Sequence, residues 1–195
     1  ITTFAGTKER YKPIKPEVTE KKKKHPIKTI KILCSNKYFI LITLAFAIIY
    51  TSLGLTGGSR IYYAKYVLGN EMINSTMTLF NYIPTILTIM LIPIFAKKFG
   101  KIKALFVGFL FYGAGLILEI AGPVNLPMIY GGLVLQGIGH AALYSCLFAI
   151  VGDVVDYSEW KDGIREEGLT YSVTSFGQKI GTGLGTAALG WILAA

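Results

Sequence analysis

The chain has 195 residues, of which 52% are hydrophobic and only 16% are charged, and its mean hydropathy is +0.51. A soluble domain of this length would have to expose much of that apolar surface to water, so the composition excludes a soluble globular protein and indicates an integral membrane protein. The formal net charge is +9, but membrane topology and contact with anionic lipid head groups account for it, so no nucleic-acid partner is expected.

The first 37 residues are polar and basic, with a run of lysines at 21–24 and no apolar periodicity. They are predicted to form a cytoplasmic loop that precedes the membrane domain. Because the chain starts at Ile1 and lacks the pattern of a signal peptide, we expect an internal fragment of a longer polypeptide. Cys34 and Cys146 have neither disulfide nor metal-ligand spacing, so no metal or resident cofactor is expected.

Five long apolar segments follow, each of which can span a bilayer as a helix. They cover residues 38–58 with an amphipathic extension to Gly69, and then residues 73–96, 102–121, 125–152 and 168–195. The short connections at 97–103 and 122–127 predict tight turns between antiparallel neighbours, and Pro84 can kink the second helix. The sequence therefore predicts an all-α membrane bundle over residues 38–195, with no strands.

The distribution of Lys and Arg orients this bundle, because basic residues are retained on the cytoplasmic side. Of the 20 Lys and Arg residues, 17 lie in 1–37, 97–103 or 153–167, which share one face if the helices alternate in direction. The opposite face holds only Arg60 and Lys65, and Lys179 lies within an apolar segment. We therefore expect a multi-pass protein of the plasma or inner membrane, with residues 1–37 in the cytoplasm.

Lys179 is a lone cation inside the last apolar segment. At about 1.5 Å per residue it lies roughly 18 Å beyond Glu167, near the middle of a hydrocarbon layer about 30 Å thick. Such a charge indicates a cavity or a substrate pathway, although a lysine that snorkels to the interface is the alternative. Tyr171 and Ser175 precede it at helical spacing, and Thr174 and Gln178 lie beside this stripe.

Two further patterns belong to the last two apolar segments. Gly177, Gly181 and Gly185 recur at every fourth position, which is typical of a close helix–helix contact. In the preceding segment Gln136, His140 and Tyr144 recur at helical spacing, and Tyr144 is predicted to lie at a depth close to that of Lys179, so that the two could line one pocket. A neutral His140 bonded to a neighbouring helix remains as plausible as a sugar or proton contact.

An acidic, Trp-containing turn is predicted between the last two segments, over residues 152–167. Asp153, Asp156 and Glu159 are spaced three apart, and Lys161, Arg165 and the basic turn at 97–103 lie on the same side, so interhelical salt bridges are available. These charges form either a cytoplasmic gate or a solvated acidic loop. Metal binding or acid–base catalysis is not expected, because nothing places the carboxylates in a dry cleft.

These residues resemble the glycoside–pentoside–hexuronide:cation symporters, the melibiose permease-like branch of the major facilitator superfamily. The resemblance covers nearly the whole chain and is carried by five motifs. They are TKER at 7–10, IYYAKYVLGN at 61–70, AKKFGKIK at 96–103, GDVVDYSEWK at 152–161 and EEGLTYSVTSFGQK at 166–179. It implies a C-terminal half fragment, with five of twelve helices (the seventh to the eleventh) and without the twelfth helix and the N-terminal half.

The resemblance also implies roles for individual residues. Lys179 matches the family's helix-eleven lysine beside the sugar and cation sites, with its acidic partners in the missing N-terminal half. Tyr144 matches an aromatic position of the sugar site that is often tryptophan, and an aromatic residue packed between helices is the alternative. The expected substrate-binding set is Lys179, Tyr144, Ser175, Thr174, Gln178 and His140, and the expected gate is Asp153, Asp156, Glu159 and Arg165.

The sequence therefore predicts part of a cation-coupled sugar or glycoside symporter that works by alternating access, with co-transported Na⁺, Li⁺ or H⁺ and no enzyme activity. Its expected partners are the sugar, the cation, the lipid bilayer and the missing half. A carrier of a lipid or peptide cargo is one alternative, and a non-transporting membrane sensor is another.

Overall fold

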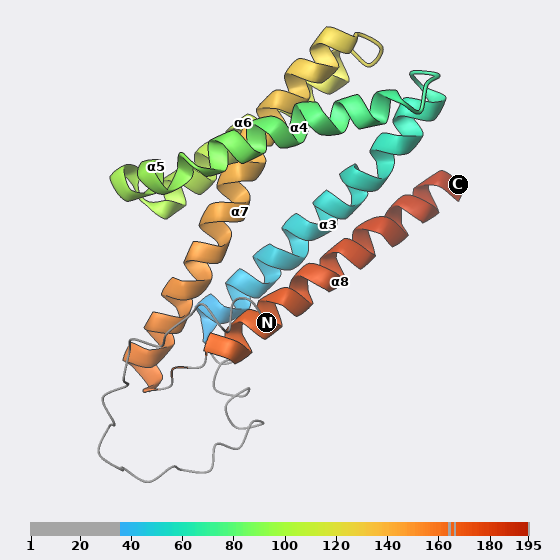
Figure 1. Cartoon of the computed structure of the whole chain (residues 1–195). Coiled ribbons are helices and arrows are strands. Elements are labelled where there is room, and N and C mark those ends of the chain that lie inside the picture. Colours follow the sequence, from blue (N-terminus) through green and yellow to red (C-terminus); the bar gives the residue numbers. More distant parts are fainter. Residues whose placement is uncertain (1–35, 164, 166, 195) are drawn as a thin grey trace, which may run out of the picture.

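The computed structural model describes residues 36–163, 165 and 167–194, and the expected cytoplasmic loop over residues 1–37 lies almost wholly outside them. The described residues form six α-helices and no strand, as expected from the sequence. The helices are α3 (Lys37–Tyr66), α4 (Ile73–Ile89), α5 (Ile92–Phe99), α6 (Lys101–Ala121), α7 (Leu126–Asp162) and α8 (Glu167–Ala194) (Figure 1).

Three of these helices, α3, α6 and α7, are long and apolar enough to cross a membrane, and α4 and α5 together make a fourth, bent candidate. The fifth expected segment is present as α8, a helix of 28 residues. At about 1.5 Å per residue α8 is long enough to span a bilayer, but its many Ser, Thr and Gly residues give it a lower hydropathy than the other segments. The protein is thus an all-α membrane bundle.

The second apolar segment is broken, but not where the sequence suggested. The helix continues through Pro84, and the bend of 53° falls between Ile89 and Ile92. Pro93, in the first turn of α5, explains the position, because proline lacks the N–H that would continue the ladder and fits well at a helix start. The break of this segment thus lies at Pro93, while Pro84 lies inside a continuous helix.

The fourth segment is longer than expected, because α7 runs on through the acidic stretch to Asp162. No glycine or proline interrupts residues 153–162, so the helix continues past the apolar region. It ends at Gly163, whose positive φ of 64° gives a left-handed C-cap. The predicted turn of residues 152–167 was thus wrong in extent: most of it is helix, and Asp153, Asp156 and Glu159 project from the end of α7.

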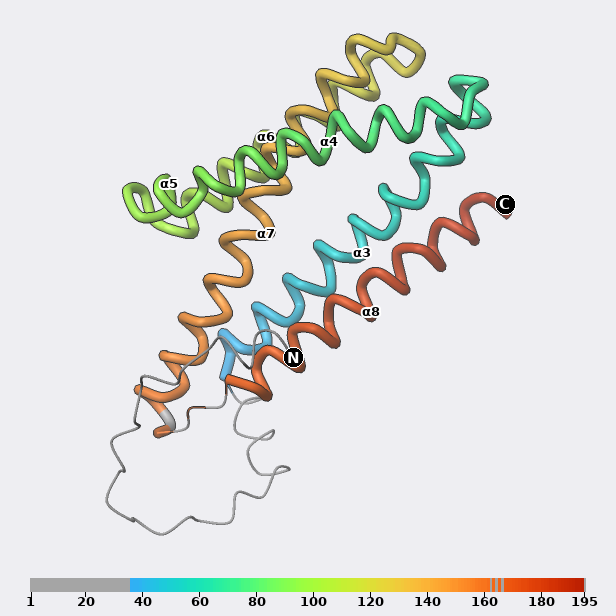
Figure 2. Tube along the Cα trace, in the orientation of Figure 1, coloured from blue at the N-terminus to red at the C-terminus, as the bar shows by residue number. Residues whose placement is uncertain are grey.

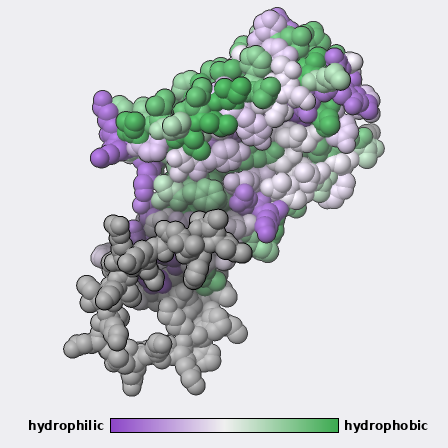
Figure 3. All heavy atoms as spheres, in the orientation of Figure 1, coloured by the Kyte–Doolittle hydropathy of each residue, from purple (hydrophilic) through white to green (hydrophobic). Residues whose placement is uncertain are grey.

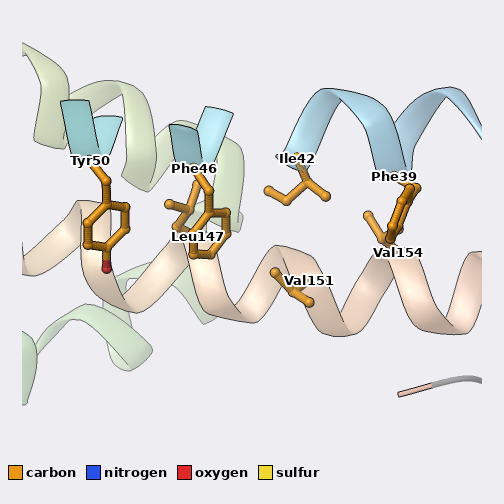
Figure 4. Close-up of a cluster of buried hydrophobic side chains, with 7 residues drawn as sticks. All are labelled: Phe39, Ile42, Phe46, Tyr50, Leu147, Val151 and Val154. Carbon is orange, nitrogen blue, oxygen red and sulfur yellow. The ribbon is translucent and has the colours of Figure 1, made fainter. Parts of the chain in front are cut away.

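The helices pack as two groups that contact each other through α3 and α7. α8 lies beside α3 and runs in the same direction, whereas α7 packs against α4 and α6 (Figures 1 and 2). Near the start of α3, Phe39, Ile42, Phe46 and Tyr50 point toward Leu147, Val151 and Val154 of α7 (Figure 4). A buried hydrogen bond of 2.9 Å from the Asn36 amide to Ser158 Oγ closes this end of the α3–α7 contact.

The outside of the bundle is apolar. Large hydrophobic side chains are exposed along α4, among them Leu79, Phe80, Ile83, Ile86 and Leu87. Figure 3 shows hydrophobic residues gathered over this part of the molecule. Such a continuous surface would be a liability in water but fits the hydrocarbon of a bilayer. The exterior therefore supports the membrane assignment independently of the sequence composition.

Candidate functional site

Lys179 lies on the open face of α8. It follows the start of the helix at Glu167 by twelve residues, or about 18 Å. A shallow hollow of about 430 Å³ surrounds it, and all of its lining comes from α8: Tyr171, Ser172, Ser175, Phe176 and Lys179. The ammonium makes no hydrogen bond or ion pair with any described residue. The sequence thus located an exposed cation with hydroxyl neighbours on one helix face.

The opposite face of α8 is buried against α3. A Cβ atom added at Gly177 would lie 3.2 Å from the Thr43 carbonyl oxygen, and one at Gly181 would press on the Ala47 carbonyl oxygen. Only glycine permits this approach, so the predicted close helix–helix contact is confirmed. Thr174 belongs to this buried face, where its hydroxyl bonds the backbone of its own helix, while Gln178 is half-buried.

Tyr144 lies on α7, and the structure does not bring it into the hollow around Lys179. Its ring is half-buried, with the Tyr50 ring of α3 at 6.5 Å and the His140 ring at 5.7 Å between centroids. In the described part of the chain, the expected substrate-binding residues therefore form two groups, one on α8 and one on α7. A single pocket would require them to be joined across α3 or by a further part of the protein.

His140 is almost wholly buried between α4, α6 and α7. Its Nδ1 atom lies 3.3 Å from Asn81 Oδ1, and its ring lies 5.0 Å from that of Tyr112. Asn81 in turn donates to the Leu133 carbonyl oxygen at 3.1 Å. Of the two alternatives for His140, this geometry matches an imidazole bonded to a neighbouring helix.

Gln136, on the same stripe of α7, is fully buried and accepts a hydrogen bond of 2.8 Å from the Arg60 guanidinium of α3. A hollow of about 410 Å³ adjoins this pair and is also lined by Glu119 of α6. The sequence marks Arg60 and Gln136 separately and does not predict that they pair. The signal that could have done so was the stripe on α7, because a buried amide at helical spacing from His140 needs a partner.

The expected gate residues form ion pairs at the end that is predicted to be cytoplasmic. Arg165 contacts Glu159 and Glu167 at 2.5 Å each and Asp156 at 3.3 Å, and Lys101 contacts Asp153 at 2.6 Å. The hydrogen bonds to Glu159 and Glu167 raise the pKa of Arg165 above its ordinary value, so the guanidinium stays charged. These pairs join α6, α7 and α8 of this chain to one another.

Long apolar helices, an apolar exterior and a buried polar stripe on α7 define a multi-pass membrane protein. The match to known families agrees with this assignment. Residues 1–195 match the family described as MFS/sugar transport protein, and the chain belongs to that family. Its place is therefore in the cell membrane.

Several curated relatives are named for a sugar or a glycoside, and another, 28% identical over 97% of this chain and 41% of its own length, is named a putative 2,3-dihydroxypropane-1-sulfonate exporter of Salmonella typhimurium. The chain is 30% identical to the isoprimeverose transporter of Lactiplantibacillus pentosus over 98% of its own length and 40% of the relative. It is 27% identical to the glucuronide carrier protein homolog of Escherichia coli over 85% of its length and 36% of the relative. It is 26% identical to the raffinose carrier protein of Pediococcus pentosaceus over 83% of its length and 25% of the relative. The chain thus spans about two fifths or less of these relatives.

Proposed function

We propose that this chain is the C-terminal membrane part of a longer, cation-coupled sugar symporter that works by alternating access. Membership of the MFS/sugar transport family and relatives named for isoprimeverose, glucuronides and raffinose support a sugar or glycoside as the substrate. Sugar and cation bind near the membrane midplane, between this half and an N-terminal half, and the two halves rock around that site.

The observation that carries this proposal is the unpaired ammonium of Lys179. A charge at this depth is costly unless a carboxylate, hydroxyls or water compensate it, and no described residue does so. Ser175, one turn earlier on the same face, adds a hydroxyl. The open face of α8 therefore turns toward the N-terminal half, where a carboxylate completes the site and sugar hydroxyls reach Lys179.

Coupling follows from linkage between the two ligands. If sugar and cation each favour the loaded carrier that can change conformation, each raises the affinity for the other by the same factor, and a downhill Na⁺, Li⁺ or H⁺ gradient drives sugar uphill. The acidic end of α7 supplies the cytoplasmic gate. Arg165 pairs with Asp156 and Glu159, and these carboxylates, at 67% and 48% side-chain exposure, remain open to a basic partner in the N-terminal half.

The test is sugar uptake by the full-length parent carrier, reconstituted into vesicles under imposed Na⁺, Li⁺ or H⁺ gradients. We expect Lys179→Ala to lower the rate of gradient-driven uptake by about 100-fold or more, since a substrate-site charge is removed. Lys65→Ala is the matched control, because Lys65 is an exposed lysine paired with Glu71 at 2.7 Å and should leave uptake unchanged. Full uptake by Lys179→Ala would contradict the proposal.

The same assay identifies the substrate. α-Galactosides, β-xylosides and glucuronides are offered in turn, and saturating uptake of one class names the cargo. A carrier that moves none of these sugars under any of the three gradients would refute a sugar symporter.

A further inference from the structure

A groove of about 560 Å³ lies where the start of α3, the α5–α6 turn and the end of α7 meet. Its lining is mostly apolar and includes three aromatic rings, those of Tyr38, Phe99 and Tyr157. By the distribution of Lys and Arg, these three chain segments lie at the cytoplasmic membrane surface. The groove is separate from the Lys179 face and from the polar stripe of α7.

The ammonium group of a lysine lies over each of the three rings. Lys37 Nζ lies 5.0 Å from the Tyr38 ring centroid, Lys98 Nζ lies 5.3 Å from that of Phe99, and Lys161 Nζ lies 5.9 Å from that of Tyr157. The ring quadrupole attracts an ammonium that lies over the ring face, and the N–H groups of that ammonium can still donate hydrogen bonds to an anion. The groove is therefore apolar inside and rimmed by cations.

Lysines outnumber carboxylates among the lining and rim residues of the groove. Lys101 and Lys103 also line the groove, whereas Asp153 is the only carboxylate among its lining residues, and Lys101 already pairs with it at 2.6 Å. Four ammonium groups around the described groove are thus left without a carboxylate partner: those of Lys37, Lys98, Lys103 and Lys161. Figure 3 shows hydrophilic atoms gathered at the end of the molecule where α5 lies.

We infer that this groove binds an anionic phospholipid of the cytoplasmic leaflet. The phosphate contacts the rim lysines, and an acyl chain lies along the apolar lining formed by Ile102, Ile150 and Val154. An amphiphile satisfies both halves of the groove, while a free phosphate would leave its apolar part empty. Trp160, which is 81% exposed beside Tyr157, sits where interfacial aromatics anchor a protein to head groups.

The test uses the parent carrier in native mass spectrometry, with phosphatidylglycerol and phosphatidylcholine added at equal concentration. We expect the wild type to retain phosphatidylglycerol in preference to phosphatidylcholine. Lys98→Gln together with Lys103→Gln should weaken phosphatidylglycerol binding by roughly ten- to thirty-fold, since two rim charges are lost. Ile102→Glu, which places a carboxylate in the lining, should have the same effect without removing a lysine.

Lys65→Gln is the matched control, because Lys65 also lies over a tyrosine ring, that of Tyr66 at 5.8 Å, but at the other end of α3. It should bind phosphatidylglycerol as the wild type does, and excess glycerol phosphate should not displace the lipid. Equal retention of the two lipids, an unchanged double variant, an equal loss in the control, or displacement by glycerol phosphate would each overturn the inference. Thermal unfolding of every variant confirms that it is folded.

Discussion

Two buried amide side chains connect helices inside the apolar bundle. Asn81 of α4 donates to the Leu133 carbonyl oxygen and lies 3.3 Å from the His140 imidazole, both on α7. Gln136 of α7 accepts from Arg60 of α3. In hydrocarbon no water competes for these hydrogen bonds. Each bond therefore fixes how one helix is rotated about its own axis relative to its neighbour. At the scale of single residues, polar pairs therefore specify the packing that apolar contacts leave open.

Replacing Asn81 tests this role. We expect Asn81→Leu to destabilise the parent carrier by about 0.6–2 kcal/mol, since two contacts to α7 are lost. In detergent the thermal midpoint should fall by roughly 2–6 °C. Asn74→Leu is the control, because Asn74 lies seven residues earlier on α4 and its side chain bonds no described residue. Equal shifts in both variants would show that the Asn81 contacts do not matter.

The sequence predicted which polar residues matter better than it predicted their partners. The spacing of Gln136, His140 and Tyr144 marked one face of a helix, and Arg60 was one of two basic residues expected on the face opposite the cytoplasm. To predict their partners, one must know how α3 and α4 are oriented around α7, and this orientation depends on contacts between residues far apart in the chain. Helical periodicity carries no information on that rotation.

At the scale of elements, glycine brings α3 and α8 unusually close. Gly54 of α3 and Gly181 of α8 both face backbone of the other helix, and a Cβ at Gly54 would lie 2.7 Å from the Thr182 carbonyl oxygen. Backbones at this distance gain dispersion contacts along the whole pair, which is the main attraction available between helices in lipid. The two helices therefore move as one unit.

A matched pair of glycine substitutions measures this contact. Gly181→Leu forces the backbones of α3 and α8 apart, and we expect a loss of about 1–3 kcal/mol or a failure to fold. Gly57→Leu places the same side chain on α3, three residues after Gly54, where a Cβ meets nothing within 4 Å, and should be tolerated. Thermal unfolding in detergent compares them, and a similar loss in both would refute the account.

Element boundaries show what the sequence could not settle. The apolar pattern ended near Gly152, whereas backbone hydrogen bonding carries α7 to Gly163 regardless of polarity. Similarly, Pro84 and Pro93 look alike in sequence, yet only the second stands at a break, because the first fits within a continuous helix packed against α7. Hydropathy indicates which residues lie within the hydrocarbon layer, and a helix can continue beyond that layer.

At the scale of the whole molecule, the described ion pairs lie within one half of the proposed carrier. Arg165 ties the end of α7 to the start of α8, and Lys101 ties α6 to α7. If the proposed half tilts as a rigid body, these contacts would stay intact. A gate must then use the exposed sides of the same carboxylates, facing the other half, and exposed pairs of about 0–1 kcal/mol each suit a contact that forms and breaks in every cycle.

Neutralising two of these carboxylates should open the cytoplasmic side. In a parent carrier with Cys34→Ser and Cys146→Ser, we expect Asp156→Asn with Glu159→Gln to speed the cytoplasmic labelling of Tyr171→Cys by roughly three- to ten-fold. Tyr171 is exposed one turn into α8, so its labelling reports access. Lys161→Gln, a charge change at the same end, should leave the rate unchanged. A slower rate in the double variant would exclude the gate.

The length of α7 has a mechanical consequence. With 37 residues the helix is about 55 Å long, far more than a bilayer requires. From the level of Tyr144 to its acidic tip it extends about 27 Å, so a tilt of roughly 10° would displace the tip by about 5 Å. Because Ser158, Asp153 and Glu159 bind this tip to the other helices of the same chain, the tip would move together with them, and a small tilt of the proposed half would be enough to separate its carboxylates from a charged partner on the other half.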